Sequence, residues 1–403
     1  MKKRSLLKSL EIRGRYGVDV TEQLAVNLAS FLAAQRLNKV CVAMDPRPSS
    51  GSLYSCFIES AVSRGVDVYC LGIVPTPMLV KYAETIGVAL CVMVTASHNP
   101  VQDNGFKVFS LNSIAKQAWL QHKCSKQGLI KGRRFERSNH SRSLYLEALP
   151  KQSYNLRRSC LVDAARGVWH YVPEVFDALN INATFVHEKN PNLINEHAAI
   201  LKPNAFRSMP NADQYDLCIC VDGDADRLQL YKHGIHLDGD DLLYTLFRSD
   251  PQSMVGTVLT NEALVSLMAD EGHHLYRASV GDHHVYQLMN AHNIEVGGEP
   301  CGHLIHSNWL SSSDPVFLLS QLLKLESIQA LPNKLDSMML NLDGSLNVSE
   351  LTELCAAFAV RQVVRKSNTE NKVRVYLEGC QSEISACQSA LRSHLQTLEP
   401  SHA

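Results

Sequence analysis

Short apolar runs alternate with mixed polar and apolar stretches along most of the chain. Each apolar run predicts a buried strand: 40–44, 66–70, 88–94, 159–162, 183–186, 217–221 and 257–260. The stretches between them have a helical pattern: 53–64, 78–85, 173–179, 240–247 and 262–270. Strands that alternate with helices are typical of sheets covered by helices on both faces. The pattern therefore predicts an α/β protein with three successive units built on mixed or parallel sheets.

The end of the chain has a different pattern. Two strand candidates, 359–364 and 373–377, precede a helical stretch at 383–398, which predicts a small α+β domain. Earlier in the chain, Asp103-Asn104-Gly105 is a turn signal before a strand at 106–109, and the polar, basic residues 115–139 resemble a linker. From these features we expect four domains, with the following bounds: 1–138, 139–233, 234–342 and 343–403.

Composition narrows the classes of function. The chain has 403 residues, 45% of them hydrophobic and 20% charged, as in an ordinary globular protein. A net charge of −1 supplies no field that attracts nucleic acid or acidic membranes. No apolar run approaches the roughly 20 residues that span a bilayer, and the basic start lacks the apolar core of a signal peptide. We expect a cytoplasmic protein with no nucleic-acid or membrane partner. The twelve cysteines include no CxxC pair, which indicates reduced thiols packed as small apolar groups.

A polar loop, Thr95-Ala96-Ser97-His98-Asn99-Pro100, follows the apolar run at 88–94. In open α/β sheets, ligands bind outside the carboxyl ends of the strands, so Ser97 is at a position where a ligand-binding or catalytic residue is expected. Ser97 is not in a G-x-S-x-G elbow, which disfavours a hydrolase. A serine here could carry a phosphoryl group covalently, because two easier transfers would then replace one difficult transfer. A surface loop without a catalytic role is the alternative.

An acidic loop, Asp222-Gly223-Asp224-Ala225-Asp226-Arg227, follows the apolar run at 217–221. Three carboxylates so close together repel one another unless a cation neutralises them, and hard divalent ions prefer oxygen ligands. The spacing also opens an EF-hand, but that loop needs Gly at its sixth position and Glu at its twelfth, where this chain has Arg227 and His233. The sequence therefore predicts a divalent metal site, with a solvated acidic turn as the alternative.

Two weaker clusters come later. Gly297 to His303 places two glycines before Glu299, Cys301 and His303, which suits a ligand-binding loop or an ordinary glycine turn. Arg365 to Glu370 combines a cation, hydroxyl groups and turn-forming residues, which suits a phosphate cradle or a polar turn between strands. The histidine pairs 273–274 and 283–284 would point to opposite faces of a strand, so we interpret them as structural or surface residues.

The four clusters, in this order, resemble the α-D-phosphohexomutase family, and the similarity covers nearly the whole chain. Further stretches carry it: Asp103 to Lys107, Val162 to Gly167, Pro173 to Phe176, Ile194 to His197, Asp238 to Tyr244, and Val255 to Thr257. Within the family, these stretches are most similar to bacterial members that act on glucosamine phosphates.

The resemblance implies four domains around a central cleft, which contribute in turn a phosphoserine loop, a metal loop, a sugar loop and a phosphate loop. Ser97 would carry the phosphate and, with Asp222, Asp224 and Asp226, would bind one Mg²⁺. Arg13, His98 and Lys107 would lie near the transferring phosphate, where an acid or base is needed. The implied substrate-binding residues are Arg227, Glu299, Cys301, His303, Arg365, Ser367, Asn368 and Thr369. Sugar monophosphates would be the small-molecule partners, a sugar bisphosphate the activator, and the assembly a monomer or homodimer.

Several residues depart from the family pattern. Cys301 stands where serine is usual in the sugar loop, His283 where arginine is common after Gly-Asp, Asn368 where glycine is usual, and Pro315 where glycine is expected. The first hypothesis is a mutase that interconverts glucosamine 6-phosphate and glucosamine 1-phosphate. Activity on mannose or glucose phosphates is the alternative within the family. A descendant that binds sugar phosphates without catalysis is the alternative outside enzymes.

Overall fold

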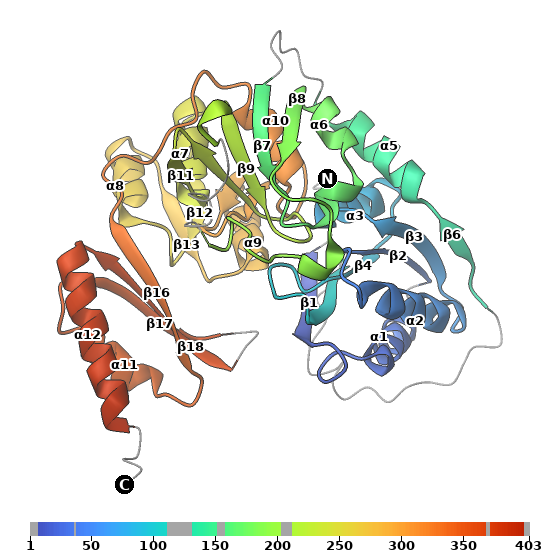
Figure 1. Cartoon of the computed structure of the whole chain (residues 1–403), viewed down its shortest axis with the longest axis horizontal. Helices are drawn as coiled ribbons and strands as arrows, with labels where there is room; N and C mark the ends of the chain where they lie inside the picture. Colours follow the sequence, from blue (N-terminus) through green and yellow to red (C-terminus); the bar gives the residue numbers. More distant parts are fainter. Residues whose placement is uncertain are drawn as a thin grey trace.

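The structure is a computed structural model, and it describes residues 7–35, 38–110, 131–150, 158–202, 212–367 and 371–398. The described strands form four sheets, of six, five, four and three strands. The first three sheets and their helices are packed together, and the C-terminal domain extends to one side of them (Figure 1). Mixed α/β domains followed by a small C-terminal α+β domain confirm the fold class expected from the sequence.

The first sheet has the strand order β1-β5-β4-β2-β3-β6. Its strands are β1 (Leu7–Arg15), β2 (Lys39–Met44), β3 (Asp67–Ile73), β4 (Leu90–Val94), β5 (Asp103–Ser110) and β6 (Arg134–Glu136). Side chains alternate between its faces: Val40 and Val42 face one core, and Cys41 and Ala43 face the other. The helices on the first face are α1 (Glu22–Ala34) and α2 (Ser50–Val62), and those on the second are α3 (Thr76–Thr85) and α5 (Ser138–Ala148). Burial on both faces explains why the central strands β2 and β4 are nearly continuous apolar runs.

The second sheet has the order β11-β10-β9-β7-β8, and the third has the order β13-β12-β14-β15. The strands of the second sheet are β7 (Arg158–Asp163), β8 (Ile181–Phe185), β9 (Leu217–Val221), β10 (Leu228–Lys232) and β11 (Ile235–Leu237). Those of the third are β12 (Met254–Thr257), β13 (Leu275–Ala278), β14 (Val296–Gly298) and β15 (Leu304–His306). The helices of this region are α6 (Glu174–Ala178), α7 (Gly239–Ser249), α8 (Glu262–Asp270), α9 (Asp282–His292) and α10 (Pro315–Leu322).

One topology recurs in all three sheets. Each has three adjacent parallel strands, β4-β2-β3, β9-β7-β8 or β14-β12-β13, and an antiparallel strand, β5, β10 or β15, beside the first of them. The polar clusters around Ser97, Asp222 and Glu299 all lie on the connection into that antiparallel strand. The three candidate loops are therefore the same loop in three repeats of one topology.

The C-terminal sheet has the order β16-β18-β17 and is antiparallel. Its strands are β16 (Asp336–Asp343), β17 (Arg361–Lys366) and β18 (Lys372–Gly379), and its helices are α11 (Val348–Cys355) and α12 (Gln381–Leu398). Val373, Val375 and Leu377 of β18 pack with the two helices in one core. Arg374 and Tyr376 alternate with them, so they point to the opposite face, and both line the central cleft.

Three local expectations need correction. Asp103-Asn104-Gly105 is not a turn: it begins β5 and pairs with residues 13–15 of β1, because the chain turns earlier, just after Pro100. The strand expected at 257–260 is β12, which ends at Thr257. His283 and His284 lie in the first turn of α9 and not on a strand, and His283 lines the central cleft, so it is neither buried core nor outer surface.

The sheets also bear on the expected domain limits. Residues 131–139 of the expected linker include β6, which pairs with β3, and the start of α5, which packs on α3 and β3; residues 115–130 lie outside the described part. The limit at 233–234 falls between the paired strands β10 and β11, and the limit at 342–343 falls inside β16. We propose limits near residues 150, 238 and 335, which leave every sheet whole. None of the described helices is long and apolar enough to cross a membrane.

Candidate active site

Ser97 lies next to the acidic loop. The Ser97 hydroxyl donates a hydrogen bond to Asp222 Oδ2 at 2.7 Å, although the two residues are 125 positions apart in the sequence. Both side chains are fully buried. The loop between β4 and β5 thus meets the loop between β9 and β10 at the carboxyl ends of β4 and β9. This contact is the one on which the phosphoryl-transfer hypothesis depends.

The backbone at Ser97 is held in an uncommon conformation. Ser97 has φ 52°, in the left-handed region that non-glycine residues seldom adopt. Its amide donates to Thr95 Oγ1 at 2.8 Å, and its carbonyl accepts from Arg47 Nη2 at 2.8 Å and from Asn195 Nδ2 at 2.6 Å. Strained residues persist where their surroundings over-determine them, and they cluster at functional sites. Three hydrogen bonds to its backbone, from or to Thr95, Arg47 and Asn195, therefore hold the serine in this conformation.

Arg47 is the centre of this support. It forms a fully buried ion pair with Asp45 at 2.9 Å, and its guanidinium also donates to the carbonyls of Asn99, Pro100 and Asp103. Sequence reasoning did not identify Arg47, Asp45 or Asn195 as part of the site. The available signal was that Asp45-Pro46-Arg47 follows the strand beside β4, at the same edge of the sheet as Ser97.

The acidic triad forms a compact, buried group. One oxygen from each of Asp222, Asp224 and Asp226 lies within 4.8 Å of the others. Lys107 Nζ binds both Asp224 Oδ2, at 2.7 Å, and Asp226 Oδ2, and the Thr76 hydroxyl donates to Asp224 Oδ2 at 2.5 Å. The other oxygens, Asp224 Oδ1 and Asp226 Oδ1, are buried and have no hydrogen-bond partner among the described residues. Unpaired buried carboxylate oxygens that converge in this way fit a divalent metal ion.

The electrostatics of the triad reflect its crowding. Burial, together with repulsion from Asp226 and Asp224, raises the pKa of Asp222 to about 6. Burial opposes the ionisation of Asp226 as well, but Lys107, His303 and Arg227 outweigh it and lower the pKa of Asp226 to about 2. Burial likewise disfavours the charged form of Lys107, yet Asp224 and Asp226 raise its pKa above the usual range. Lys107, which belongs to β5, is therefore a buried cation that is paired with the acidic loop below the cleft surface.

Two arginines and two histidines cover the triad on its cleft side. Arg13 Nη1 donates to His98 Nδ1 at 3.4 Å, and Arg227 Nε donates to His303 Nε2 at 3.1 Å and lies 3.8 Å from Asp222 Oδ2. Since His303 Nε2 accepts, Nδ1 carries the proton and donates to the Asp226 carbonyl at 3.0 Å. The cations Arg227 and Arg13, with burial, lower the pKa of His98 well below its usual value. His98 is thus a neutral imidazole beside Ser97.

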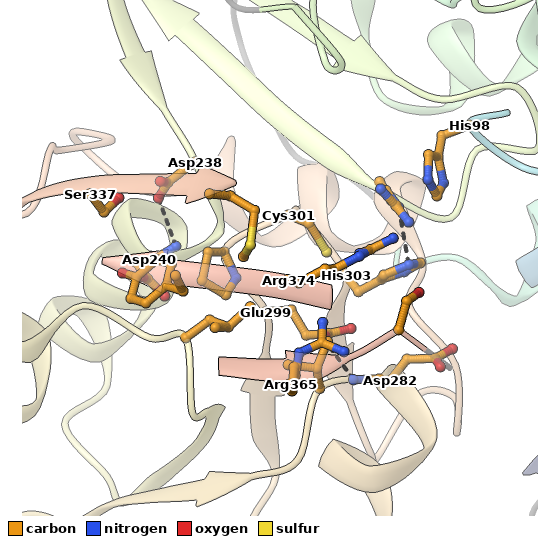
Figure 2. Close-up of a pocket in the computed structure, with 18 of the residues that line it drawn as sticks. His98, Asp238, Asp240, Asp282, Glu299, Cys301, His303, Ser337, Arg365 and Arg374 are labelled. Atoms are coloured by element: carbon orange, nitrogen blue, oxygen red, sulfur yellow. Dashed lines mark hydrogen bonds between the residues drawn. The ribbon is translucent and has the colours of Figure 1, made fainter. Parts of the chain in front are cut away.

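A cleft of about 450 Å³ opens above this group and is lined by residues from the first three sheets and the C-terminal sheet. Glu299, Cys301 and His303 contribute from the loop between β14 and β15, and their ligand atoms lie within 4.8 Å of one another (Figure 2). Gly302 lets that loop approach β10: it has φ +100°, and a Cβ there would lie 2.4 Å from the Leu228 carbonyl oxygen. Burial and Glu299 raise the pKa of Cys301 to about 12, so Cys301 presents a neutral thiol to the cleft.

The C-terminal sheet closes the cleft with cations. Arg365 and Arg374 line the cleft (Figure 2), and sequence reasoning did not select Arg374. Ser367 lines the cleft as well. Arg365 and Arg374 are register partners on β17 and β18, and like charges at such a pair destabilise a sheet. Burial and Arg374 lower the pKa of Arg365. A bound dianion would offset this repulsion. Asn368 and Thr369 lie outside the described residues.

Three further cleft residues were not predicted as part of the site. Asp240 and Asp282 contribute carboxyl groups from the starts of α7 and α9, and His283 follows Asp282. Asp238 to Tyr244 was noted as a stretch of family similarity, which is the only signal that pointed toward Asp240. Single acidic residues at helix starts are common as caps, so their type alone does not reveal a cleft.

Comparison with known proteins identifies the family. The chain matches three domains described as belonging to phosphoglucomutase/phosphomannomutase: α/β/α domain I over residues 4–118, α/β/α domain III over 238–339, and the C-terminal domain over 340–389. It is 30% identical to the phosphoglucosamine mutase of Burkholderia lata, with 87% of each chain covered. It is 29% identical to phosphoglucosamine mutase 2 of Shewanella frigidimarina, with 94% of this chain and 96% of that protein covered.

Solved structures share the fold. A phosphoglucomutase/phosphomannomutase family protein from Burkholderia thailandensis superposes with a TM-score of 0.79 at 20% identity, with 100% of this chain and 99% of that chain covered. The N-acetylphosphoglucosamine mutase of Aspergillus fumigatus, solved with GlcNAc-6P and magnesium, gives a TM-score of 0.58 at 17% identity, with 88% and 81% covered. With its serine and acidic loops in contact and its sequence matched over most of its length, this chain belongs to the phosphoglucomutase/phosphomannomutase family, the α-D-phosphohexomutases.

Proposed function

We propose that this protein is a phosphoglucosamine mutase, which interconverts glucosamine 6-phosphate and glucosamine 1-phosphate through a phosphate on Ser97. The observation that carries the proposal is the 2.7 Å hydrogen bond from Ser97 Oγ to Asp222, inside a buried triad of carboxylates. The names of the relatives support the choice of substrate. We expect the reaction to take place in the cytoplasm, in a monomer or homodimer, on free sugar phosphates.

The proposed reaction has two transfers. The bond between Ser97 Oγ and phosphorus breaks as the phosphoryl group bonds to a hydroxyl oxygen of the sugar monophosphate. The hydroxyl proton passes, by way of a base at the cleft wall, to Ser97 Oγ. The resulting bisphosphate turns end for end, and its other phosphate returns to Ser97. Glu299, His98 and His303 line the cleft and are the groups that we propose to test as this base. Lys107 is held in ion pairs with Asp224 and Asp226. Arg365, Ser367 and Arg374 would hold the phosphate that is not reacting.

The residues present fit Mg²⁺. Asp222, Asp224 and Asp226 would hold it together with an oxygen of the phosphorylated Ser97, and it would offset the negative charge that develops during phosphoryl transfer. The surrounding side chains have their own tasks. Lys107 and Thr76 keep two carboxylates oriented, and Arg227 supplies a second positive charge at the cleft side of the triad.

Among the described residues that depart from the family pattern, Pro315 is compatible with the structure around it. Pro315 occupies the first position of α10, where a missing amide hydrogen costs nothing, and Asp314 caps the helix through Val316 and Phe317. Cys301 and His283 both line the cleft, so they bear on which sugar is preferred. Glucose and mannose phosphates are therefore the alternative substrates to compare.

An assay of the purified protein tests the proposal. We expect turnover of glucosamine 6-phosphate with Mg²⁺ and a bisphosphate activator, one phosphate on Ser97 by intact mass and peptide mapping, and loss of both in Ser97→Ala. Ser110→Ala, which changes a buried serine at the far end of β5, is the matched control and should keep both. Preferred turnover of glucose or mannose phosphate would change the substrate. A protein without phosphate and without turnover on any of the three sugars would contradict the proposal.

A further inference from the structure

Asp240 is a buried carboxyl group in the wall of the cleft, and the reaction above gives it no role. Its side chain is 2% exposed, and its Oδ2 accepts a hydrogen bond from the backbone amide of Asn261 at 2.9 Å. Its other oxygen, Oδ1, has no hydrogen-bond partner among the described residues. A buried polar atom without a partner is costly, and a bound ligand is one of the few things that can offset the cost.

The acidic neighbours of Asp240, Asp238 and Asp241, already have a cationic partner. Lys334 Nζ binds Asp238 Oδ1 at 2.6 Å and Asp241 Oδ2 at 2.7 Å, and Asp238 also caps α7. Two of the three carboxyl groups thus share one ammonium group, and Asp240 is the third, which this ammonium group does not contact. Burial and the charge of Asp238 raise the pKa of Asp240 to about 8. A cation delivered from the cleft would stabilise the carboxylate form.

Asp240 is also next to the loop that contains Glu299 and Cys301. The preceding residue, Gly239, donates its amide to the Pro300 carbonyl at 3.0 Å, and a Cβ at Gly239 would lie 2.0 Å from the Glu299 carbonyl oxygen. The start of α7 therefore packs directly on that loop. Figure 2 shows Asp240 on the same cleft wall as Asp238, with Cys301 and Glu299 beside it.

We propose that Asp240 binds the amino group of an amino-sugar phosphate and so selects this class of substrate over neutral hexose phosphates. The inference rests on the proposed function and deepens it. The charges in the cleft are complementary to such a ligand, because Arg13, Arg227, Arg365 and Arg374 suit its phosphate while Asp240 suits its ammonium group. An ammonium group supplies both the positive charge and the hydrogen-bond donors that Asp240 Oδ1 lacks. A neutral sugar hydroxyl would supply only a weaker donor.

The variant Asp240→Asn tests the subsite. Asparagine keeps the volume and an acceptor for the Asn261 amide but loses the charge. We expect the ratio of kcat/KM for glucosamine 6-phosphate to kcat/KM for glucose 6-phosphate to fall about 10- to 100-fold, the usual effect of one charge-assisted hydrogen bond. Glu271→Gln is the matched control: it removes the charge of a carboxylate that lies outside the cleft lining and is paired with Arg248 at 2.6 Å, so the ratio should not change.

The outcomes separate this inference from the proposed function. A loss in Asp240→Asn that is equal for both sugars, or an equal loss of discrimination in Glu271→Gln, would overturn the subsite and leave the mutase intact. A wild-type protein that prefers glucose phosphate would overturn the choice of substrate instead. Calorimetric binding of the two 6-phosphates gives the same comparison without turnover. There, a wild-type preference for the amino sugar that disappears in Asp240→Asn supports the subsite, and an unchanged preference overturns it.

Discussion

At the scale of single residues, the acidic site is held together by buried charges. Lys107 is 1% exposed and lies between Asp224 and Asp226, while two oxygens of the triad have no partner among the described residues. The same crowding that disfavours three carboxylates in the free protein is what makes the site receptive to a cation. Stability and metal binding should therefore be coupled at this site.

Replacing Lys107 tests that coupling. Lys107→Met leaves two buried carboxylates without their counter-ion, so the free energy of unfolding of the metal-free protein should fall by about 3–5 kcal/mol. Saturating Mg²⁺ should recover part of the loss, because the ion neutralises the same carboxylates. Urea unfolding with EDTA and with Mg²⁺ measures both values. An equal loss under the two conditions would contradict this coupling.

A residue outside the cleft gives a pH prediction. Burial, with the nearby cations Lys189 and Arg166, lowers the pKa of His170 to about 4. Because the folded pKa lies below the ordinary value of 6.5, the neutral form contributes stability that is complete above pH 6.5 and lost as the pH falls toward 4. The ring stacks on Phe185 with centroids 4.4 Å apart, so His170→Phe keeps the packing. Between pH 7 and pH 4, the free energy of unfolding of the variant, measured with urea, should fall by about 2–3 kcal/mol less than that of the wild type. Identical acid curves would refute this assignment.

At the scale of elements, the three candidate loops are the same connection in three repeats, and each is positioned by a buried strand. This is why the sequence was informative: the apolar runs that became β4 and β9 predicted strands, and polar residues at their carboxyl ends predicted the loops with Ser97 and Asp222. The loop of Glu299 was less evident because β14 and β15 are only three residues long.

What the sequence did not reveal are contacts made between distant elements. Arg47, Asn195 and Arg374 are single polar residues in ordinary surroundings, and only the fold brings them to the serine loop or to the cleft. Predictions from local sequence were also wrong where pairing between distant strands determined the backbone conformation. Asp103-Asn104-Gly105 has the composition of a turn, yet pairing with β1 extends it as the start of β5.

The support of the serine loop by the end of β2 gives an element-scale prediction. Arg47→Gln leaves Asp45 buried and uncompensated and removes donors from four carbonyl groups of the loop. We expect the free energy of unfolding to fall by about 3–5 kcal/mol and kcat to fall about 100-fold, since a small misplacement of a reacting group has effects of that size. Arg142→Gln, at a partly exposed pair with Glu174, is the matched control and should change neither. A folded Arg47→Gln protein with full activity would contradict the positioning role.

At the scale of the whole molecule, the cleft is complete only if the C-terminal domain is correctly oriented. Arg361 of β17 donates to the carbonyls of Val258 at 2.8 Å and Thr260 at 2.9 Å, and it is paired with the buried Glu378. The Glu262 amide also donates to Glu378. These contacts attach the C-terminal sheet, with Arg365 and Arg374, to the loop that follows β12.

Loss of this attachment should weaken substrate binding before it affects the chemistry. In Arg361→Met we expect KM for glucosamine 6-phosphate to rise about tenfold, because a smaller fraction of molecules would have the complete cleft, while kcat changes less. Small-angle scattering should show a larger radius of gyration for the variant than for the wild type. A change in kcat with KM and the scattering curve unaltered would place Arg361 outside this role.

The most direct test follows the phosphate itself. The protein is charged with labelled phosphate from a sugar bisphosphate, freed of small molecules and mixed rapidly with glucosamine 6-phosphate. The account predicts one labelled phosphate per chain on Ser97 and its transfer to the sugar in a single turnover at a rate no slower than kcat. Label on another residue, or label on Ser97 that is released only to water, would contradict it.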